Sequence, residues 1–394
     1  MKKLLQINTV SNMLSTGKIT NDLAVVAQRN GWETYIAYGR SAKPGVSQEI
    51  RVGSIINPYL HFASNWLLDR EGLASKRATR AFLRQVDAIK PDIIHLHNIH
   101  DHYINYQLLF GYLADHDIPV VWTQHDCWSF TGGCVYYDLF DCRKWEEGCH
   151  HCPERRALFT DSSFRNWQLK KEWINRIEKM VLVPVSEWLA GALRTSSIKG
   201  KDIRVIHNGV DIKAYRPVPG NCGDGKFRIL GVAAPWAARK GLPDFCRLRT
   251  MLPEDYQITL VGLSREQIRE LPSGITGMER TSDREELVRL YSESDVFVNP
   301  TYSDTLPTTN LEALACGTPV ITYNTGGASE TVDCKTGIVV EQGNVEGLRL
   351  AIERIKTCTK ALYSPSCREK AEKDFDKDQR YEDYMRLYEE LLLR

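Results

Sequence analysis

The 394-residue sequence predicts an α/β protein made of two doubly wound domains, each built around a parallel sheet. A strand–turn–helix–strand pattern opens the chain at Lys3–Thr9, and a second alternation of this kind starts at Phe227. Between them, residues 215–226 (YRPVPGNCGDGK) are rich in Pro and Gly, which is typical of a linker or a long loop. This length is enough for two to three domains with substantial cores.

The composition is that of an ordinary globular protein, with 42% hydrophobic and 26% charged residues. A net charge of +1 gives no general reason to expect a nucleic-acid partner. Polar residues interrupt the first apolar run, which therefore predicts a strand and not a signal peptide. No apolar run approaches the roughly 18 residues that a membrane-spanning helix needs. We expect a cytoplasmic protein, with peripheral membrane contact left open.

The first half alternates strands and helices. Apolar runs predict strands at Lys3–Thr9, Glu33–Tyr38, Ile93–His97, Val120–Thr123, Val181–Val185 and Arg204–Ile206. Helical patterns occupy the stretch before Gly31 and residues 74–89, 167–180 and 187 onward. Residues 15–18 (STGK) are predicted to form a turn at the place of a phosphate-binding loop. Because Gly17 is their only glycine, the stretch matches neither G-x-G-x-x-G nor a Walker motif, and a simple tight turn remains the alternative.

Polar side chains follow two of these strands. Asn98 and His100 come after the strand Ile93–His97, and His125 comes after Val120–Thr123. Ligands of open α/β sheets bind at the carboxyl ends of strands, so we expect these residues to line an active-site edge. The four histidines of residues 95–102 (HLHNIHDH) also suggest a metal, but alternating histidines at a strand end more often bond backbone or ligand groups.

The stretch Asp295–Glu330 forms the strand–loop–helix–strand unit around which we organise the function. A strand at residues 296–298 leads into a loop, a helix begins near Pro307, and a second strand spans residues 319–323. Asp304 precedes the helix and Glu312 lies inside it, while the amides of Thr308 and Thr309 belong to its first turn. Acids can bind sugar hydroxyls and free amides can bind phosphate, the combination that a sugar nucleotide requires. Taken singly, the alternatives are that Asp304 is a turn former and that Glu312 is a solvated helix residue.

Two cations follow the strand Arg228–Val232 in the second half. Arg239 and Lys240 precede Gly241, just beyond the strand end. Arg can bind a pyrophosphate bidentately and Lys can bind it as a point charge, although isolated charges of this kind are often solvated. Further strands are expected at residues 258–262 and 337–340, with a helix at 282–291 and a last helix from 378 to 394.

Five of the eleven cysteines crowd one segment. Cys134, Cys142, Cys149 and Cys152 are spaced x7, x6 and x2, and the last two form a C-x-x-C knuckle. Four thiolates of this kind can close a structural zinc site that would fix a long loop. Disulfides and unconnected thiols are the alternatives, and Cys127, His150 or His151 could replace one ligand. Four thiolates leave no open coordination position, so no catalytic metal is expected.

Six short motifs occur in a fixed order along the chain. They are STGK at 15–18, HD at 125–126, NGVD at 208–211, RKG at 239–241, D-x7-E at 304–312 and GTPVI at 317–321. The ordered set resembles retaining family-4 glycosyltransferases of the GT-B fold, with Asp304 where the family usually has Glu. The cysteine segment resembles an insertion in exopolysaccharide glycosyltransferases of the colanic-acid type.

The resemblance implies two Rossmann-like domains that face a central cleft. Residues 1–207, with the cysteine-rich loop 127–153, would bind the acceptor, residues 208–377 would bind the nucleotide sugar, and residues 378–394 would cross back to the first domain. The implied reaction moves a sugar from a nucleotide-diphosphate sugar to a glycan, which could be lipid-linked, in surface or exopolysaccharide biosynthesis. The anomeric configuration would be retained.

The resemblance also implies roles for individual residues. Arg239, Lys240 and the amides of Thr308 and Thr309, with the Gly17 loop, would bind the donor diphosphate. His125 and Asp304 would hold the donor sugar, Glu312 the ribose, and Asn98 and His100 would lie on the acceptor side. The cations would stabilise the leaving group without a metal. Two rival hypotheses remain: a nucleotide-sugar epimerase or phosphorylase on the same fold, and a non-catalytic nucleotide-binding subunit.

Overall fold

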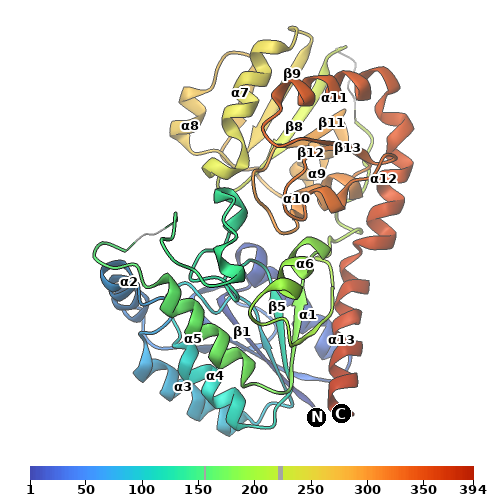
Figure 1. Ribbon diagram of the computed structural model, residues 1–394. Coiled ribbons are helices and arrows are strands. Elements are labelled where there is room, and N and C mark those ends of the chain that lie inside the picture. The colour runs from blue at the N-terminus through green and yellow to red at the C-terminus, as the bar shows by residue number, and fades with distance from the viewer. Residues whose placement is uncertain (155–156, 221–224) are drawn as a thin grey trace. The chain divides into compact units, whose positions relative to one another are not determined.

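The computed structural model describes residues 1–154, 157–220 and 225–394, so part of the predicted linker, residues 221–224, lies outside the described residues. The chain divides into two compact units. The first unit comprises Met1–Ile206 and Tyr381–Arg394, and the second comprises His207–Arg380. In each unit helices surround a sheet of parallel strands (Figure 1), which confirms the predicted α/β class.

The sheet of the first unit has seven strands in the order β3-β2-β1-β4-β5-β6-β7. All neighbouring strands pair in parallel. The strands are β1 (Lys3–Ser11), β2 (Glu33–Ala42), β3 (Gln48–Arg51), β4 (Ile93–Leu96), β5 (Val120–Gln124), β6 (Met180–Pro184) and β7 (Asp202–Ile203).

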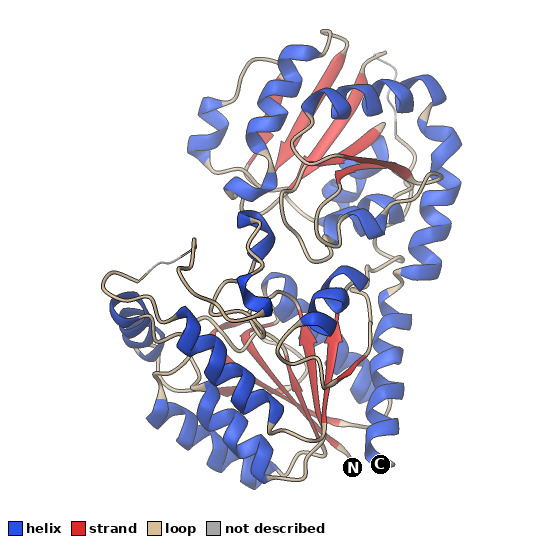
Figure 2. Cartoon of the chain, viewed as in Figure 1, coloured by secondary structure: helices blue, strands red, loops and turns tan. Residues whose placement is uncertain are grey.

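Helices cover both faces of this sheet (Figure 2), because successive strand residues point to opposite sides. Leu5 faces the core packed by α3, α4, α5 and α6, whereas Leu4 faces the core packed by α1 and α13. The helices are α1 (Leu14–Arg29), α2 (Asn57–Leu68), α3 (Lys76–Ile89), α4 (Tyr106–Asp115), α5 (Ser163–Asn175), α6 (Glu187–Thr195) and α13 (Lys377–Leu392).

The last helix, α13, begins in the second unit, and from Tyr381 onward it belongs to the first. Its buried Tyr388 hydroxyl lies 2.6 Å from Nδ1 of His95, inside the sheet. Near the end of the helix, Glu390 forms a bidentate ion pair with Arg204, at 2.5 and 2.9 Å. These contacts tie the end of the chain to the core of the first unit.

The second unit holds a six-stranded parallel sheet in the order β10-β9-β8-β11-β12-β13. Its strands are β8 (Phe227–Val232), β9 (Tyr256–Val261), β10 (Ile275–Met278), β11 (Val296–Asn299), β12 (Val320–Tyr323) and β13 (Gly337–Val340). Its helices are α7 (Leu242–Met251), α8 (Arg265–Glu270), α9 (Arg284–Glu293), α10 (Thr308–Ala315), α11 (Val345–Cys358) and α12 (Lys360–Asp374).

Each sheet reverses its winding direction once. The first strand of each unit lies in the interior of its sheet, so the order reverses between β1 and β4 and between β8 and β11. At such a point the connecting segments leave the sheet on opposite faces, and their divergence opens a crevice at the carboxyl ends of the strands. These two edges are therefore where side chains of functional importance are expected.

Three local predictions were wrong. The STGK segment lies inside the first turn of α1, which begins at Leu14, and does not form a turn. The helix predicted over 167–180 is shifted to Ser163–Asn175. The Lys201 ammonium bonds its last carbonyl, of Asn175, and the carbonyl of Ile177 just beyond its end. The strand predicted at 204–206 is two residues earlier, as the short edge strand β7.

Candidate functional site

Arg239 and Lys240 lie in a short 3₁₀ helix, η3 (Ala238–Lys240), beyond the end of β8. Gly241 follows with φ +75°, and a Cβ at this position would stand 2.2 Å from the carbonyl oxygen of Pro300. Only glycine allows this close approach to the loop after β11. The RKG element is therefore held beside that loop by a backbone contact that no larger residue permits.

Asp304 lies in this neighbouring loop and contacts both cations. Its Oδ2 lies 2.5 Å from Nζ of Lys240 and 3.8 Å from Nη1 of Arg239. The same Arg239 nitrogen donates to the carbonyl oxygen of Ser303 at 2.7 Å. The three charged side chains are only 16% to 21% exposed. The structure thus brings together three of the predicted site residues at the point where the second sheet reverses its winding.

The backbone around Asp304 is fixed by a third strand end. Gly327, after β12, donates its N–H to the carbonyl oxygen of Asp304 at 2.9 Å. Gly326 has φ +51°, and a Cβ there would stand 2.1 Å from that same oxygen. Segments from β8, β11 and β12, which are neighbours in the sheet, therefore converge on Asp304. This convergence explains why Arg239 and Lys240 are ordered around a single carboxylate.

Helix α10 starts four residues after Asp304, at Thr308, with Pro307 as its N-cap residue. Pro307 provides no side-chain cap, and the first amides of a helix have no partner within the helix. Thr308 and Thr309, whose amides belong to this first turn, are half-buried residues. Two cations, one carboxylate and a helix N-terminus carry a net positive charge and together favour binding of an anion.

Glu312 has different neighbours from Asp304. It is half-buried in α10, and its Oε2 accepts a hydrogen bond from the hydroxyl of Tyr291, on α9, at 2.9 Å. A partly buried carboxylate needs donors of this kind. The two acids of the D-x7-E motif therefore lie on one loop and helix, where Glu312 bonds Tyr291 and Asp304 bonds Lys240.

In the first unit, His125 belongs to a hydrogen-bonded chain whose direction can be assigned. The amide nitrogen of Gln6 donates to the carbonyl of Thr20, so the amide oxygen of Gln6 faces Nε2 of His97 at 3.0 Å. Nε2 of His97 must then carry its proton, which leaves Nδ1 of His97 as the acceptor. Nε2 of His125 lies 3.1 Å from this Nδ1 and donates to it. Gln6 thus sets the tautomer of His125 through His97.

Both histidines of this chain are neutral at pH 7. Removal from water lowers the pKa of His125 to about 4, although Asp126 acts in the opposite direction. Burial, and then the neighbouring His95 and His125, hold the pKa of His97 well below its usual value. Because the Nε2–H of neutral His125 is donated to His97, its other ring nitrogen, Nδ1, is an acceptor without charge, which suits contact with a hydroxyl group.

His100 is the charged counterpart of His125. Burial disfavours its imidazolium, but Asp126 and Asp101 outweigh this and hold the pKa of His100 well above its usual value. Its Nε2 lies 2.8 Å from Oδ2 of Asp126, whose other oxygen accepts the N–H of Trp128 at 2.9 Å. His100 also lines a cavity of about 560 Å³ with Trp128, Asp101 and Glu71. Asn98 contributes backbone bonds instead, because its carbonyl accepts from the hydroxyls of Thr9 and Tyr103.

Gly17 has a packing role in the structure. It is buried in the first turn of α1, where a Cβ would stand 3.0 Å from Cγ2 of Val10 on β1. Its carbonyl accepts the N–H of Asn12 and the hydroxyl of Thr20. These contacts account for a glycine at this position, and the predicted approach to a diphosphate stays a prediction.

The four cysteines of the predicted zinc site line one small cavity of about 10 Å³. Burial raises the pKa of Cys134 to about 12 and that of Cys149 to about 11, so both are thiols at pH 7. Among residues 1–154, 157–220 and 225–394, no group of three or more His, Cys, Asp and Glu side chains is arranged to hold a metal ion. None of the cysteines that the structure describes forms a disulfide. Among the residues that it describes, the structure thus shows neither a formed zinc site nor a disulfide.

Sequence reasoning missed two residues that shape the first-unit site. Gln6 was given no role, and Asp126 was named only as part of the HD motif, although each determines the state of a predicted histidine. A polar residue inside the buried run of β1 is a signal that could have indicated Gln6, since a buried amide needs partners. For Asp126, the signal was its position next to His125 at a strand end.

The first prediction concerns the titration of His125. Its folded-state pKa lies below the unfolded value of about 6.5, so His125 contributes stability above pH 6.5 that is lost as the pH falls toward 4. Between pH 7 and 4.5 the loss should be about 2–3 kcal/mol. Nuclear magnetic resonance of ring-labelled protein should show a His125 midpoint near 4, assigned with a His125→Gln variant. A midpoint near 6.5 would contradict the buried, neutral state.

Known proteins resemble the chain over both units. The model described as "Glycosyltransferase Family 4" matches residues 17–214, half of the chain, and the model described as "Glycosyl transferases group 1" matches residues 227–357. The colanic acid biosynthesis glycosyl transferase WcaC of Escherichia coli K12 is 25% identical over 320 residues, which cover 76% of this chain and 77% of WcaC.

Solved structures share the fold along the whole chain. Sucrose-phosphate synthase from Thermosynechococcus elongatus superposes with a TM-score of 0.75 at 18% identity and covers 100% of both chains. HepE from Anabaena, solved in complex with UDP-glucose, has a TM-score of 0.66 at 15% identity and covers 99% of this chain and 100% of its own. These likenesses confirm the predicted GT-B fold. With the family match over residues 17–214, they show that the protein belongs to glycosyltransferase family 4 and is a glycosyltransferase.

Proposed function

We propose that the protein transfers a hexosyl group from a nucleotide-diphosphate sugar to a glycan acceptor, with retention at the anomeric carbon, in surface or exopolysaccharide biosynthesis. The observation that carries the donor class is the group formed by Arg239, Lys240 and Asp304 at the reversal point of the second sheet. WcaC, named for colanic acid biosynthesis, supports the polysaccharide role, and the UDP-glucose complex of HepE supports a nucleotide-sugar donor.

The proposed diphosphate site uses charges that are already in place. Asp304 orders both cations before a donor binds, so binding costs little further side-chain conformational entropy. Arg239 can bind two phosphate oxygens at once and Lys240 can act as a point charge. The amides of Thr308 and Thr309 add uncharged donors near the same loop. Glu312, which accepts a hydrogen bond from the hydroxyl of Tyr291, would also accept hydrogen bonds from the ribose hydroxyls.

The proposed chemistry needs no protein nucleophile. The bond from the anomeric carbon to the phosphate oxygen breaks, the acceptor hydroxyl oxygen bonds to the same face of that carbon, and the hydroxyl proton passes to the leaving phosphate. Arg239 and Lys240 stabilise the negative charge that develops on the phosphate, and no step is assigned to a metal. Asp304 and the neutral His125 would orient the hydroxyl groups of the donor sugar.

The acceptor side of the proposal rests on the cavity beside His100. The buried Trp128 lines its wall, while Glu71 and Asp101 offer hydrogen-bond acceptors that suit the hydroxyls of a saccharide. Asn98 adds a half-buried side chain at the same sheet edge. We infer a glycan acceptor for this cavity and include lipid-linked saccharides in that class. The cytoplasmic location stays a prediction.

The second prediction tests the diphosphate site. The double substitution of Arg239→Ala and Lys240→Ala should weaken UDP binding by about a hundredfold or more, because charge-assisted hydrogen bonds contribute about 1.5–3 kcal/mol each and two are removed. Isothermal titration calorimetry measures the change. Arg265→Ala is the matched control, since this exposed cation of the same unit pairs with Glu279 instead. Equal UDP affinity in the double variant and the wild type would exclude these cations from the site.

The third prediction concerns the stereochemical outcome. A thermal-shift screen of nucleotide sugars should first identify the donor, and proton nuclear magnetic resonance of the product should then show the donor's own anomeric configuration. Same-face attack requires this result because the new bond forms where the phosphate left. An inverted product would refute the mechanism, and conversion of the donor sugar to an epimer without any acceptor would favour the rival hypothesis.

The fourth prediction concerns the cysteine segment. A structural zinc is supported by the C-x-x-C spacing and by the cavity that Cys134, Cys142, Cys149 and Cys152 line together. We expect one zinc per chain in protein purified without chelator, measured by plasma mass spectrometry, and a large loss in a Cys149→Ser, Cys152→Ser variant. Cys246→Ser is the control, because Cys246 lies in α7 of the second unit. Folded wild-type protein without zinc would remove the metal from the proposal.

A further inference from the structure

Helix α2 exposes an unusual amount of apolar surface. Its sequence, NPYLHFASNWLL, contains no charged residue. Tyr59 is 71% exposed, Leu60 67%, Phe62 55% and Trp66 47%. The two residues before the helix, Ile55 and Ile56, are 69% and 63% exposed. Contiguous exposed apolar surface of this kind marks a site of interaction with another molecule. The six residues just named are called the α2 face below.

Helix α2 is amphipathic, but its polar face is turned toward the protein and its apolar face toward the outside. Its polar residues Asn57, His61 and Asn65 recur every four positions and face the protein, where a surface helix ordinarily turns its apolar stripe. Asn57 donates to the carbonyl of Tyr103 at 3.1 Å and to the hydroxyl of Ser75 at 3.0 Å. His61 lies 2.7 Å from the same hydroxyl, and Asn65 donates to a carboxylate oxygen of Glu71 at 2.6 Å. Hydrogen bonds thus hold α2 in place with its apolar residues turned outward.

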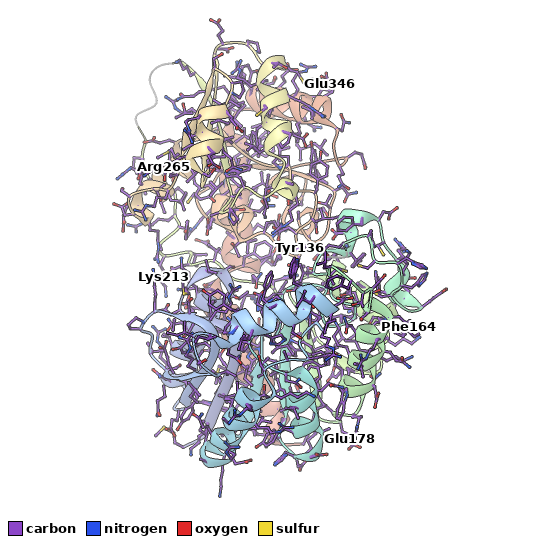
Figure 3. The ribbon with its side chains drawn as sticks, turned by 90° about the vertical axis from the view of Figure 1, so that its left-hand side faces the viewer. Tyr136, Phe164, Glu178, Lys213, Arg265 and Glu346 are labelled. Atoms are coloured by element: carbon purple, nitrogen blue, oxygen red, sulfur yellow. The ribbon has the colours of Figure 1, made fainter. Side chains whose placement is uncertain are left out.

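A neighbouring loop extends this apolar surface. The N–H of Leu158 donates to the carbonyl oxygen of Trp66 at 2.8 Å, and Leu158 and Phe159 are themselves exposed. In Figure 3, which views the first unit from the side of α2, Phe164 at the start of α5 also projects from the surface. Apolar side chains from three segments of the chain therefore gather around one helix.

We propose that the α2 face rests in the interfacial layer of an anionic lipid bilayer and docks the enzyme there. Tyr59 and Trp66 carry amphipathic rings of the kind that prefer the headgroup level. A helix of twelve residues that lies in the plane of the interface can bury one apolar face among the acyl chains. Among the described residues, no helix is long and apolar enough to cross a membrane. Docking through α2 requires no such helix.

The surrounding charges favour lipid over a second copy of the chain. Ser75, which bonds Asn57 and His61, is followed at once by Lys76 and Arg77 and then by Arg80, all exposed at the start of α3. A two-fold dimer through the α2 face would bring these cations toward their own copies. Anionic headgroups would instead attract them. The nearby acids Asp69 and Glu71 bond inward, to the N–H of Ser162 and to Asn65.

This inference deepens the proposed function, because a docked enzyme can reach a lipid-linked acceptor, but its test uses neither donor nor acceptor. The fifth prediction is that the full chain floats with vesicles of phosphatidylcholine and 30% phosphatidylglycerol, and that binding weakens as salt rises. The variant Tyr59→Asp, Leu60→Asp should bind at least tenfold more weakly. Both residues are exposed, so the variant should fold, as circular dichroism can verify. Leu350→Asp, Leu362→Asp, at exposed apolar sites of the second unit, is the matched control.

A charge variant separates the electrostatic contribution to vesicle binding from the apolar contribution of the α2 face. The triple variant Lys76→Glu, Arg77→Glu, Arg80→Glu should bind anionic vesicles more weakly than the wild type, by about fivefold or more for each residue. On vesicles of pure phosphatidylcholine the triple variant should bind as well as the wild type. Equal vesicle binding by the wild type and the Tyr59, Leu60 variant would overturn the proposal. The proposal would also be overturned if the wild type bound no vesicles but formed a dimer in sedimentation velocity, and if the Tyr59, Leu60 variant were a monomer. UDP affinity, measured in parallel without lipid, tests the donor site independently. Failure of the membrane proposal can therefore be told apart from failure of the proposed function.

Discussion

The ion group of Arg239, Lys240 and Asp304 depends on one geometric constraint: parallel strands end at a common edge, and the strand order reverses only once. Residues after β8 and after β11 become neighbours because those strands are adjacent at the reversal, although 64 positions separate Lys240 from Asp304. Glycines on both sides make the approach close, since Gly241 and Gly326 each lie where a Cβ would collide with a carbonyl oxygen. The sheet therefore positions charges that no local segment could bring together.

The same constraint acts differently in the first unit. There the edge gathers histidines, and their charge states are set by what lies behind them. Gln6, inside β1, orients His97 and through it His125, whereas Asp126 keeps His100 charged. One edge of a sheet thus presents a neutral ring next to a buried ion pair. That separation is chemically useful, because a sugar hydroxyl and an anionic group need different partners.

The α2 face and the cavity beside His100 belong to one region of the first unit. Phe62 and Trp66 contribute to both, since they line the cavity and are also exposed on the helix. A second cavity, of about 630 Å³, lies under the other end of α2 and includes Arg40 and Arg51. Apolar surface, cations and a saccharide-sized cavity together are what a saccharide on an anionic lipid carrier would require.

The amino-acid sequence by itself determined the fold class, the succession of most strands and the residues at their ends, because continuous apolar runs and strand-terminating residues are local properties. It placed Asp304, Arg239, Lys240 and His125 at strand ends before any contact was known. Tertiary structure alone decided which of these residues meet: Asp304 pairs with both cations, while Glu312 turns to Tyr291. It also decided the state of the histidines and the outward apolar face of α2, for which the sequence made no prediction. Protonation depends on burial and on distant neighbours such as Gln6. The direction in which an amphipathic helix faces depends on whether its polar or its apolar stripe finds partners in the rest of the fold.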